Sequence, residues 1–170
     1  MTSRELPYLR RNLPTYSGFV GNMPTIMVID DSAADLCEIR RAFSSVGVSN
    51  PLLLVRSDDE AKRYLSGAYP YNDQAIYPVP SVIILDLSQP AGFELLTWIR
   101  NRFPNGGLLI VALTRLEEIR KISRAYALGA NSFLTKPVQA SELRELINIF
   151  GGYWLVNAMS HYRQEEIVNV

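Results

Sequence analysis

The chain has 170 residues, of which 48% are hydrophobic and 20% are charged. This balance is typical of an ordinary globular domain and argues against a disordered chain. Seventeen basic residues offset 17 acidic ones, so no global positive charge favours nucleic acid or an anionic membrane surface.

The first 24 residues are predicted to form an extended N-terminal arm. They carry three prolines and two glycines, show no clear period, and lack the apolar segment of a secretory signal. No run of about 20 apolar residues predicts a membrane span. The single cysteine, Cys37, excludes an intramolecular disulfide and fits a reducing compartment, so a cytoplasmic protein is expected.

From residue 25 onward, short apolar runs alternate with segments of helical spacing. The apolar runs are bounded by polar turns, as buried parallel strands should be, and lie at 25–29, 52–55, 81–85, 108–113 and 132–135. Helices are predicted at 33–47, 58–67, 92–103, 116–130 and 140–150. The Pro- and Tyr-rich segment 68–80 is predicted to be a surface insertion loop.

Five alternations of strand and helix predict an α/β domain over residues 25–150, followed by a C-terminal tail at 151–170. The strands should form one parallel sheet with helices on both faces. Right-handed crossovers leave few topologies, and the flavodoxin-like (βα)5 arrangement with strand order 2-1-3-4-5 is the natural candidate at this length.

The predicted strand ends carry polar side chains that should converge at one edge of the sheet, because ligands bind beyond the carboxyl ends of parallel strands. These are three carboxylates, one hydroxyl and one amine: Asp30, Asp31, Asp86, Thr114 and Lys136. Arg56 and Ser57 follow the second strand, whose place at the sheet edge is expected to hold them away from the centre.

Three neighbouring carboxylates with one lysine make a net anionic cluster. Mg²⁺ is the hard cation that such oxygen ligands usually hold. A carboxylate beside the metal can also attack a phosphoryl group and form an acyl phosphate. Lys136 would then offset charge on the phosphoryl oxygens, and Thr114 could donate a hydrogen bond to one of them.

The motifs "IDD", "LDL", "ALT" and "FLTKP" follow the first, third, fourth and fifth predicted strands. In this order they resemble the receiver domain of two-component response regulators, over residues 24–150. The resemblance implies that Asp86 accepts a phosphoryl group from a phosphohistidine on a kinase. It implies that Asp30 and Asp31 hold Mg²⁺, together with the Asp86 carboxylate and the backbone carbonyl of Ser88.

The resemblance also implies roles for residues farther along the chain. Thr114 would be the switch hydroxyl, and Lys136 the amine that pairs with the phosphoryl group. The Lys136–Pro137 bond matches a family bond that is often cis. Phe133 matches the aromatic switch position, although a strand phenylalanine is as often an ordinary core residue.

The loop at 68–80 and the "GGYWLV" at 151–156 are similar to the stand-alone receivers paired with bacterial phytochrome kinases. The implied protein is a single-domain response regulator: a phosphoacceptor with self-dephosphorylation, and no enzyme in the usual sense. Its partners would be a histidine kinase, with a phytochrome-type photoreceptor as the candidate, and a second copy of itself. No output domain or direct nucleic-acid binding is expected, since about 20 residues follow residue 150.

Two departures from the family pattern leave alternatives open. Gly92 follows Asp86 by six residues, where the family has about eight, and Arg115 stands where a small residue is usual. The guanidinium could pair with the phosphoryl group, shield it from water, or point to solvent. A pseudo-receiver, which binds partners without phosphorylation, is therefore the alternative. A dehalogenase-type phosphatase fits less well, because it expects Asp where this chain has Ser88.

Overall fold

The computed structural model describes residues 24–48, 50–104, 108–118 and 120–150, so the predicted tail and all but the last residue of the arm lie outside the described part. Within it, five parallel strands form one sheet in the order β2-β1-β3-β4-β5. Their bounds are β1 Ile26–Ile29, β2 Leu52–Val55, β3 Val82–Asp86, β4 Leu109–Arg115 and β5 Ser132–Lys136. The predicted flavodoxin-like strand order 2-1-3-4-5 is confirmed.

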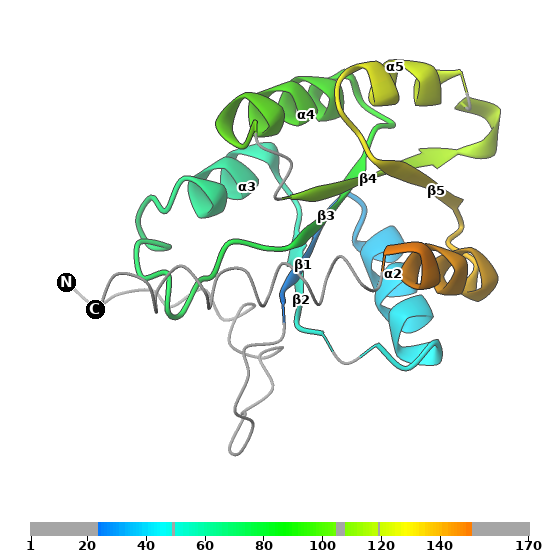
Figure 1. The fold of residues 1–170 in the computed structure, drawn as a ribbon, viewed down its shortest axis with the longest axis horizontal. Helices are drawn as coiled ribbons and strands as arrows, with labels where there is room; N and C mark the ends of the chain where they lie inside the picture. Colours follow the sequence, from blue (N-terminus) through cyan, green and yellow to red (C-terminus); the bar gives the residue numbers. More distant parts are fainter. Residues whose placement is uncertain (1–23, 49, 105–107, 119, 151–170) are drawn as a thin grey trace, which may run out of the picture.

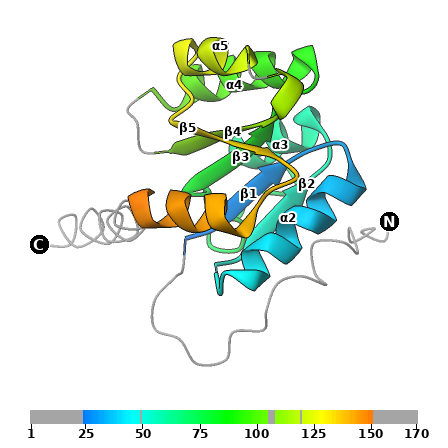
Figure 2. The same ribbon diagram turned by 90° about the vertical axis from the view of Figure 1, so that its right-hand side faces the viewer.

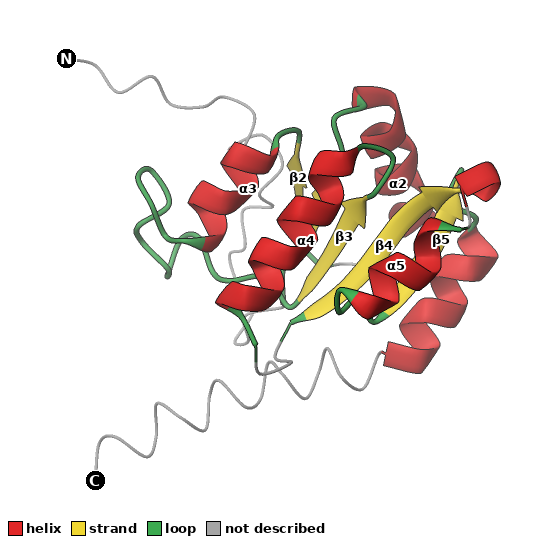
Figure 3. Cartoon of the chain, turned by 90° about the horizontal axis from the view of Figure 1, so that it is seen from above, coloured by secondary structure: helices red, strands yellow, loops and turns green. Residues whose placement is uncertain are grey.

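Helices cover both faces of this sheet (Figures 1 and 2). Their bounds are α2 Ala33–Ser45, α3 Asp58–Leu65, α4 Pro90–Arg102, α5 Lys121–Ala127 and an unlabelled last helix at 140–150. α3, α4 and α5 lie side by side on one face (Figure 3), while α2 and the helix at 140–150 lie on the other. None of the helices in the described part is long and apolar enough to cross a membrane.

The apolar core forms two clusters, one on each face, because successive strand side chains point to opposite faces. Met27 and Ile83 belong to the cluster under α3, α4 and α5. Ile26 and Ile84 belong to the cluster under α2 and the last helix, together with Leu143. The continuous apolar strand sequences therefore reflect burial on both sides.

The helix predicted at 116–130 is wrong in its first part. β4 continues through Arg115, a 3₁₀ turn follows at Leu116–Glu118, and α5 begins only at Lys121. β4 runs two residues beyond the predicted strand 108–113, because Thr114 and Arg115 pair with the end of β5, opposite Thr135 and Lys136. The residues that follow this longer strand form a 3₁₀ turn, so the α-helix begins later than its spacing predicts.

α4 begins at Pro90, two residues earlier than the predicted start at Gly92. Proline suits the first helical turn, because its fixed φ matches the helix and its missing N–H has no helical partner there. Only three residues, 87–89, thus separate β3 from α4.

The segment 68–80 contains neither helix nor strand, as predicted, but it is not merely a surface loop. Tyr71 is only 1% exposed and packs against the rings of Tyr64 and Tyr77, with centroids 5.0 and 5.2 Å away. The Tyr71 hydroxyl donates to Glu60 Oε1 at 3.0 Å. Burial and the neighbouring Glu60 carboxylate raise the pKa of Tyr71 well above its ordinary value. The loop is therefore anchored to α3 through its aromatic rings.

Candidate functional site

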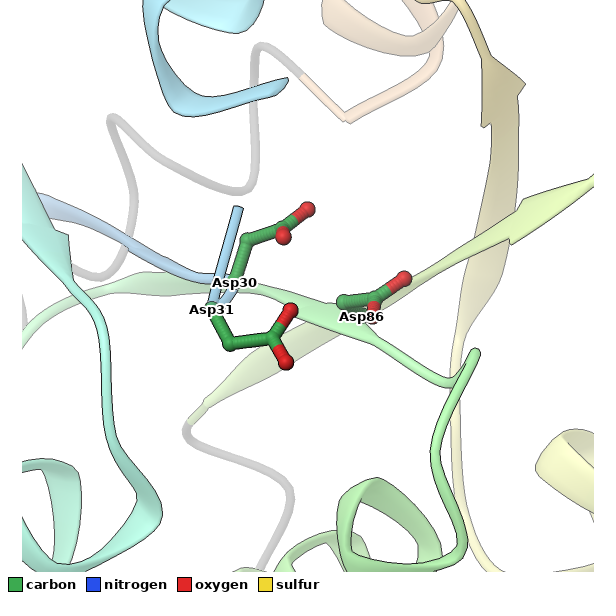
Figure 4. A group of neighbouring side chains, drawn as sticks. All are labelled: Asp30, Asp31 and Asp86. Atoms are coloured by element: carbon green, nitrogen blue, oxygen red, sulfur yellow. The ribbon is translucent and has the colours of Figure 1, made fainter. Parts of the chain in front are cut away.

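Three carboxylates gather beyond the ends of two neighbouring strands (Figure 4). Asp30 and Asp31 follow β1, and Asp86 ends β3, which pairs with β1. One carboxylate oxygen from each lies within 4.8 Å of those of the other two. Asp30 and Asp86 are buried and Asp31 is exposed, so the cluster opens to solvent on one side.

The turn from β1 into α2 fixes the position of Asp30. Its Oδ1 accepts a hydrogen bond from the Ser32 backbone N–H at 2.9 Å. Ser32 is the N-cap of α2, and its Oγ accepts from the Asp35 N–H at 3.2 Å. Ser32 therefore caps the helix, and neither Asp30 nor Asp31 has this role.

Lys136, at the end of β5, binds the cluster together. Its Nζ lies 2.7 Å from Asp30 Oδ2 and 2.9 Å from Asp86 Oδ1, and its side chain is 7% exposed. Burial alone would lower the pKa of Lys136, but the hydrogen bonds to carboxylates outweigh it and raise this pKa above its ordinary value. Lys136 is therefore a fixed positive charge, and the Lys136–Pro137 bond that follows it is cis, as the sequence resemblance implies.

Asp35 is a fourth carboxylate at the site, and the strand-end pattern of the sequence does not predict it. Its Oδ2 accepts from Lys136 Nζ at 2.8 Å and lies 3.7 Å from Arg115 Nη2. The available signal was its place in the first turn of the helix that follows Asp31, which brings the side chain back to the same edge of the sheet. This contact also turns the guanidinium of Arg115 toward the site, although half of its side chain is exposed.

The loop after Asp86 makes contacts that its sequence does not predict. Ser88 Oγ donates to Asp86 Oδ1 at 2.7 Å. The Ser88 carbonyl, the expected metal ligand, accepts from Lys121 Nζ at 2.9 Å, and this ammonium also donates to the Leu87 carbonyl and to Glu118. A carbonyl oxygen has two lone pairs, so this hydrogen bond does not exclude a metal ion. It does mean that the Ser88 carbonyl already has a cationic partner, the Lys121 ammonium.

Thr114 and Phe133 occupy the strands beyond Asp86. Thr114 is 1% exposed and follows Leu113, the register partner of Asp86. Its hydroxyl reaches only the Arg115 carbonyl, at 3.4 Å, which leaves it weakly bonded. Phe133 is half-buried against the core and packs edge-on against Tyr126, with centroids 6.5 Å apart.

The expectation that Arg56 stays away from the centre is wrong. Arg56 Nη2 donates to the Asp31 carbonyl at 3.2 Å. The pocket that contains Asp31 and Asp86 is also lined by Ser57 and Asp59. The edge strand is close enough to contribute to the pocket because β2 pairs directly with β1.

The donor set suits a hard divalent cation. Burial raises the pKa of Asp30, even though Lys136 and the Ser32 N–H act in the opposite direction. Burial thus penalises the negative charge on Asp30, and its Oδ2 has no partner apart from the Lys136 ion pair. Three oxygen ligands with one exposed member fit Mg²⁺, which keeps several waters.

Fold and site together define a doubly wound α/β protein with a carboxylate and lysine site at the carboxyl edge of its sheet. Residues 26–148 match the family model of the response regulator receiver domain. The chain belongs to this family.

The chain is similar to several response regulators, two of which are named as phytochrome response regulators. Response regulator Rcp1 of Synechocystis sp. is 25% identical over 132 residues, covering 76% of this chain and 88% of Rcp1. The solved structure of the Mn(2+)-bound form of response regulator Rcp1 matches this chain with a TM-score of 0.60. The match covers 78% of this chain and 94% of that chain. The bacteriophytochrome response regulator RtBRR is 27% identical, covering 74% of this chain and 76% of that chain, with a TM-score of 0.65. The phosphorylated cyanobacterial phytochrome response regulator RcpA is 27% identical, with a TM-score of 0.61. The match covers 78% of this chain and 94% of that chain.

Proposed function

We propose that this chain is a single-domain, cytoplasmic response regulator that accepts a phosphoryl group on Asp86 from a histidine kinase in a Mg²⁺-dependent reaction. The observation that carries the proposal is the Asp30, Asp31 and Asp86 cluster with Lys136 held against two of its members. Two similar proteins add support, since one structure is of a phosphorylated regulator and another holds Mn(2+). A phytochrome-type kinase is the partner that the named relatives suggest.

Asp86 would act as the nucleophile. One of its carboxylate oxygens forms a bond to phosphorus, the N–P bond of the phosphohistidine breaks, and the imidazole nitrogen keeps the electron pair and takes up a proton. Lys136 and the Thr114 hydroxyl would each donate to a phosphoryl oxygen. Bound Mg²⁺, held by Asp30, Asp31, Asp86 and the Ser88 carbonyl, would neutralise the charge on the transferred group.

Phe133 is proposed as the aromatic switch of this regulator. Its edge-on contact with Tyr126 and its half-buried position on β5 support such a role, since the ring lies at the border between the core and solvent. The partner would then read the change on this face of the sheet.

A pseudo-receiver is the second candidate. The bond from Lys121 to the Ser88 carbonyl favours it, because an ammonium already occupies the expected metal ligand. Beryllofluoride with Mg²⁺ separates the candidates in an NMR titration. A phosphoacceptor should show saturable shifts in the backbone amides around Asp86, whereas a pseudo-receiver should show none.

Removing one metal ligand gives a direct test of the Mg²⁺ site. Asp31→Ala should weaken Mg²⁺ binding by about tenfold or more, because a charged oxygen ligand is lost. Isothermal titration calorimetry on the full chain measures the affinity. Asp59→Ala is the matched control, since it removes an exposed carboxylate from the same pocket but not from the three-membered cluster. Equal affinities for the parent and Asp31→Ala would contradict the assignment.

We also propose a two-fold symmetric homodimer. Leu116 and Tyr126 support it as large exposed hydrophobic side chains near α5, and the aromatic stretch at 151–156 is the second expected contact, outside the described residues. Analytical ultracentrifugation should show weaker self-association for a chain that ends at Phe150 than for the full chain. Equally strong dimerisation of both would remove the tail from the interface.

A further inference from the structure

Three carboxylates compete for the Lys136 ammonium. Its Nζ lies within 2.9 Å of those of Asp30, Asp35 and Asp86. The contact with Asp35 has hydrogen-bond geometry, and an ammonium has three N–H donors to share among these carboxylates and any further anion. The proposed function nevertheless requires Lys136 to donate to a phosphoryl group on Asp86. One of the three carboxylates must then release it.

The surroundings of the three carboxylates show which one can do so. The Asp30 side chain is fully buried, and leaving it without its cation would strand a buried charge, which is strongly unfavourable. Asp86 is itself the group that carries the phosphoryl. Asp35 is 19% exposed and lies 3.7 Å from a second cation, Arg115, so it keeps water and a counter-ion when Lys136 leaves.

Arg115 and Lys136 are direct partners in the register of β4 and β5. The two residues therefore lie side by side at the carboxyl edge of the sheet, and the side chains of both contact Asp35 Oδ2. A phosphoryl group on Asp86 would lie near these two cations, because Lys136 Nζ is 2.9 Å from Asp86 Oδ1 and Arg115 is the register partner of Lys136. It carries more negative charge than a carboxylate, so it competes with Asp35 for both and is repelled by Asp35 itself.

We propose that Asp35 is an internal competitor of the phosphoryl group, which holds Lys136 and Arg115 in the unphosphorylated state and thereby lowers the affinity of the site for a phosphoryl-like anion. This inference rests on the proposed function. Asp35 acts through Lys136 and is a positioning residue. Removal of the Asp35 carboxylate should therefore strengthen anion binding at the site. Removal of a residue that merely supports the site would weaken anion binding instead.

Beryllofluoride is the probe, titrated into the full chain at a Mg²⁺ concentration that saturates each variant, with backbone amide NMR as the readout. Asp35→Asn should bind beryllofluoride about tenfold more tightly than the parent, because one like charge is lost and the neutral amide oxygen holds the lysine donor less strongly than the carboxylate does. The N-cap bond is preserved, since it uses the Asp35 backbone N–H. Asp35→Glu retains the charge and should return the affinity toward that of the parent.

Glu38→Gln is the matched control, because it removes one negative charge from an exposed position of the same helix and should leave the affinity unchanged. If the parent binds beryllofluoride and Asp35→Asn binds it equally or more weakly, the competitor role is overturned while the proposed function stands. If Glu38→Gln tightens binding as much as Asp35→Asn, the effect is one of net charge and the role is again overturned. If neither the parent nor Asp35→Asn binds the probe, the proposed function itself fails.

Discussion

Replacing Asp86 with asparagine should abolish phosphoryl labelling of the full chain. The amide has nearly the shape of the carboxylate and can still accept from Ser88 Oγ, but it is not a nucleophile toward phosphorus. Labelling by a small phosphodonor with Mg²⁺, followed by intact-protein mass spectrometry, measures the effect. The parent should gain one phosphoryl group per chain, and Asp86→Asn should gain none.

Asp59→Asn is the control for this experiment. It lines the same pocket from the first turn of α3 and undergoes the same change of side chain, yet it lies outside the carboxylate cluster. It should be labelled like the parent. Labelling that persists in Asp86→Asn would show that another residue is the phosphoacceptor, and a parent that no donor labels would favour the pseudo-receiver.

The fold was predictable because its signals are local and repeated. Four of the five strands are short apolar runs, and β1, β3 and β4 are buried on both faces of the sheet. Gly47 ends α2 with a φ of +75°, which favours glycine. The end of β4 was harder to predict for the opposite reason. Whether Thr114 and Arg115 extend β4 beyond the predicted strand 108–113 depends on β5, which lies about 20 residues farther along the chain, and a local apolar pattern does not reveal this pairing.

Strand ends predict which residues reach the site, but not which atoms they contact. Asp30, Asp86 and Lys136 were identifiable because each ends or directly follows a strand of a parallel sheet. Asp35 and Lys121 were missed because they lie on helices, where the direction of the side chain depends on how the helix starts and packs. The bond from Lys121 to the Ser88 carbonyl depends on the late start of α5, which the sequence pattern did not predict.

The short connection from β3 to α4 depends on a glycine, and the second large effect is expected there. A Cβ at Gly92 would lie 2.3 Å from the Asp86 carbonyl oxygen and 3.3 Å from Leu87 Cα. These are backbone atoms, so neither can move aside as a flexible side chain would. The resemblance to receiver domains implies about two more residues between Asp86 and this glycine than the chain has. Here α4 begins directly against the end of β3, and the missing side chain of Gly92 makes room for it.

Gly92→Ala should therefore lower the free energy of unfolding by about 2 kcal/mol, since overpacking costs roughly 1–3 kcal/mol and the better helix propensity of alanine offsets only part of this. Urea unfolding followed by circular dichroism measures the change. Ala91→Ser also adds one heavy atom, at the exposed neighbouring position, and should change the stability by less than about 0.5 kcal/mol. Because the clash pushes on the backbone of Asp86, Gly92→Ala should also bind Mg²⁺ more weakly than Ala91→Ser. A Gly92→Ala protein with parental stability and parental Mg²⁺ affinity would show that the loop can relax, and that the close approach of α4 is not what positions Asp86.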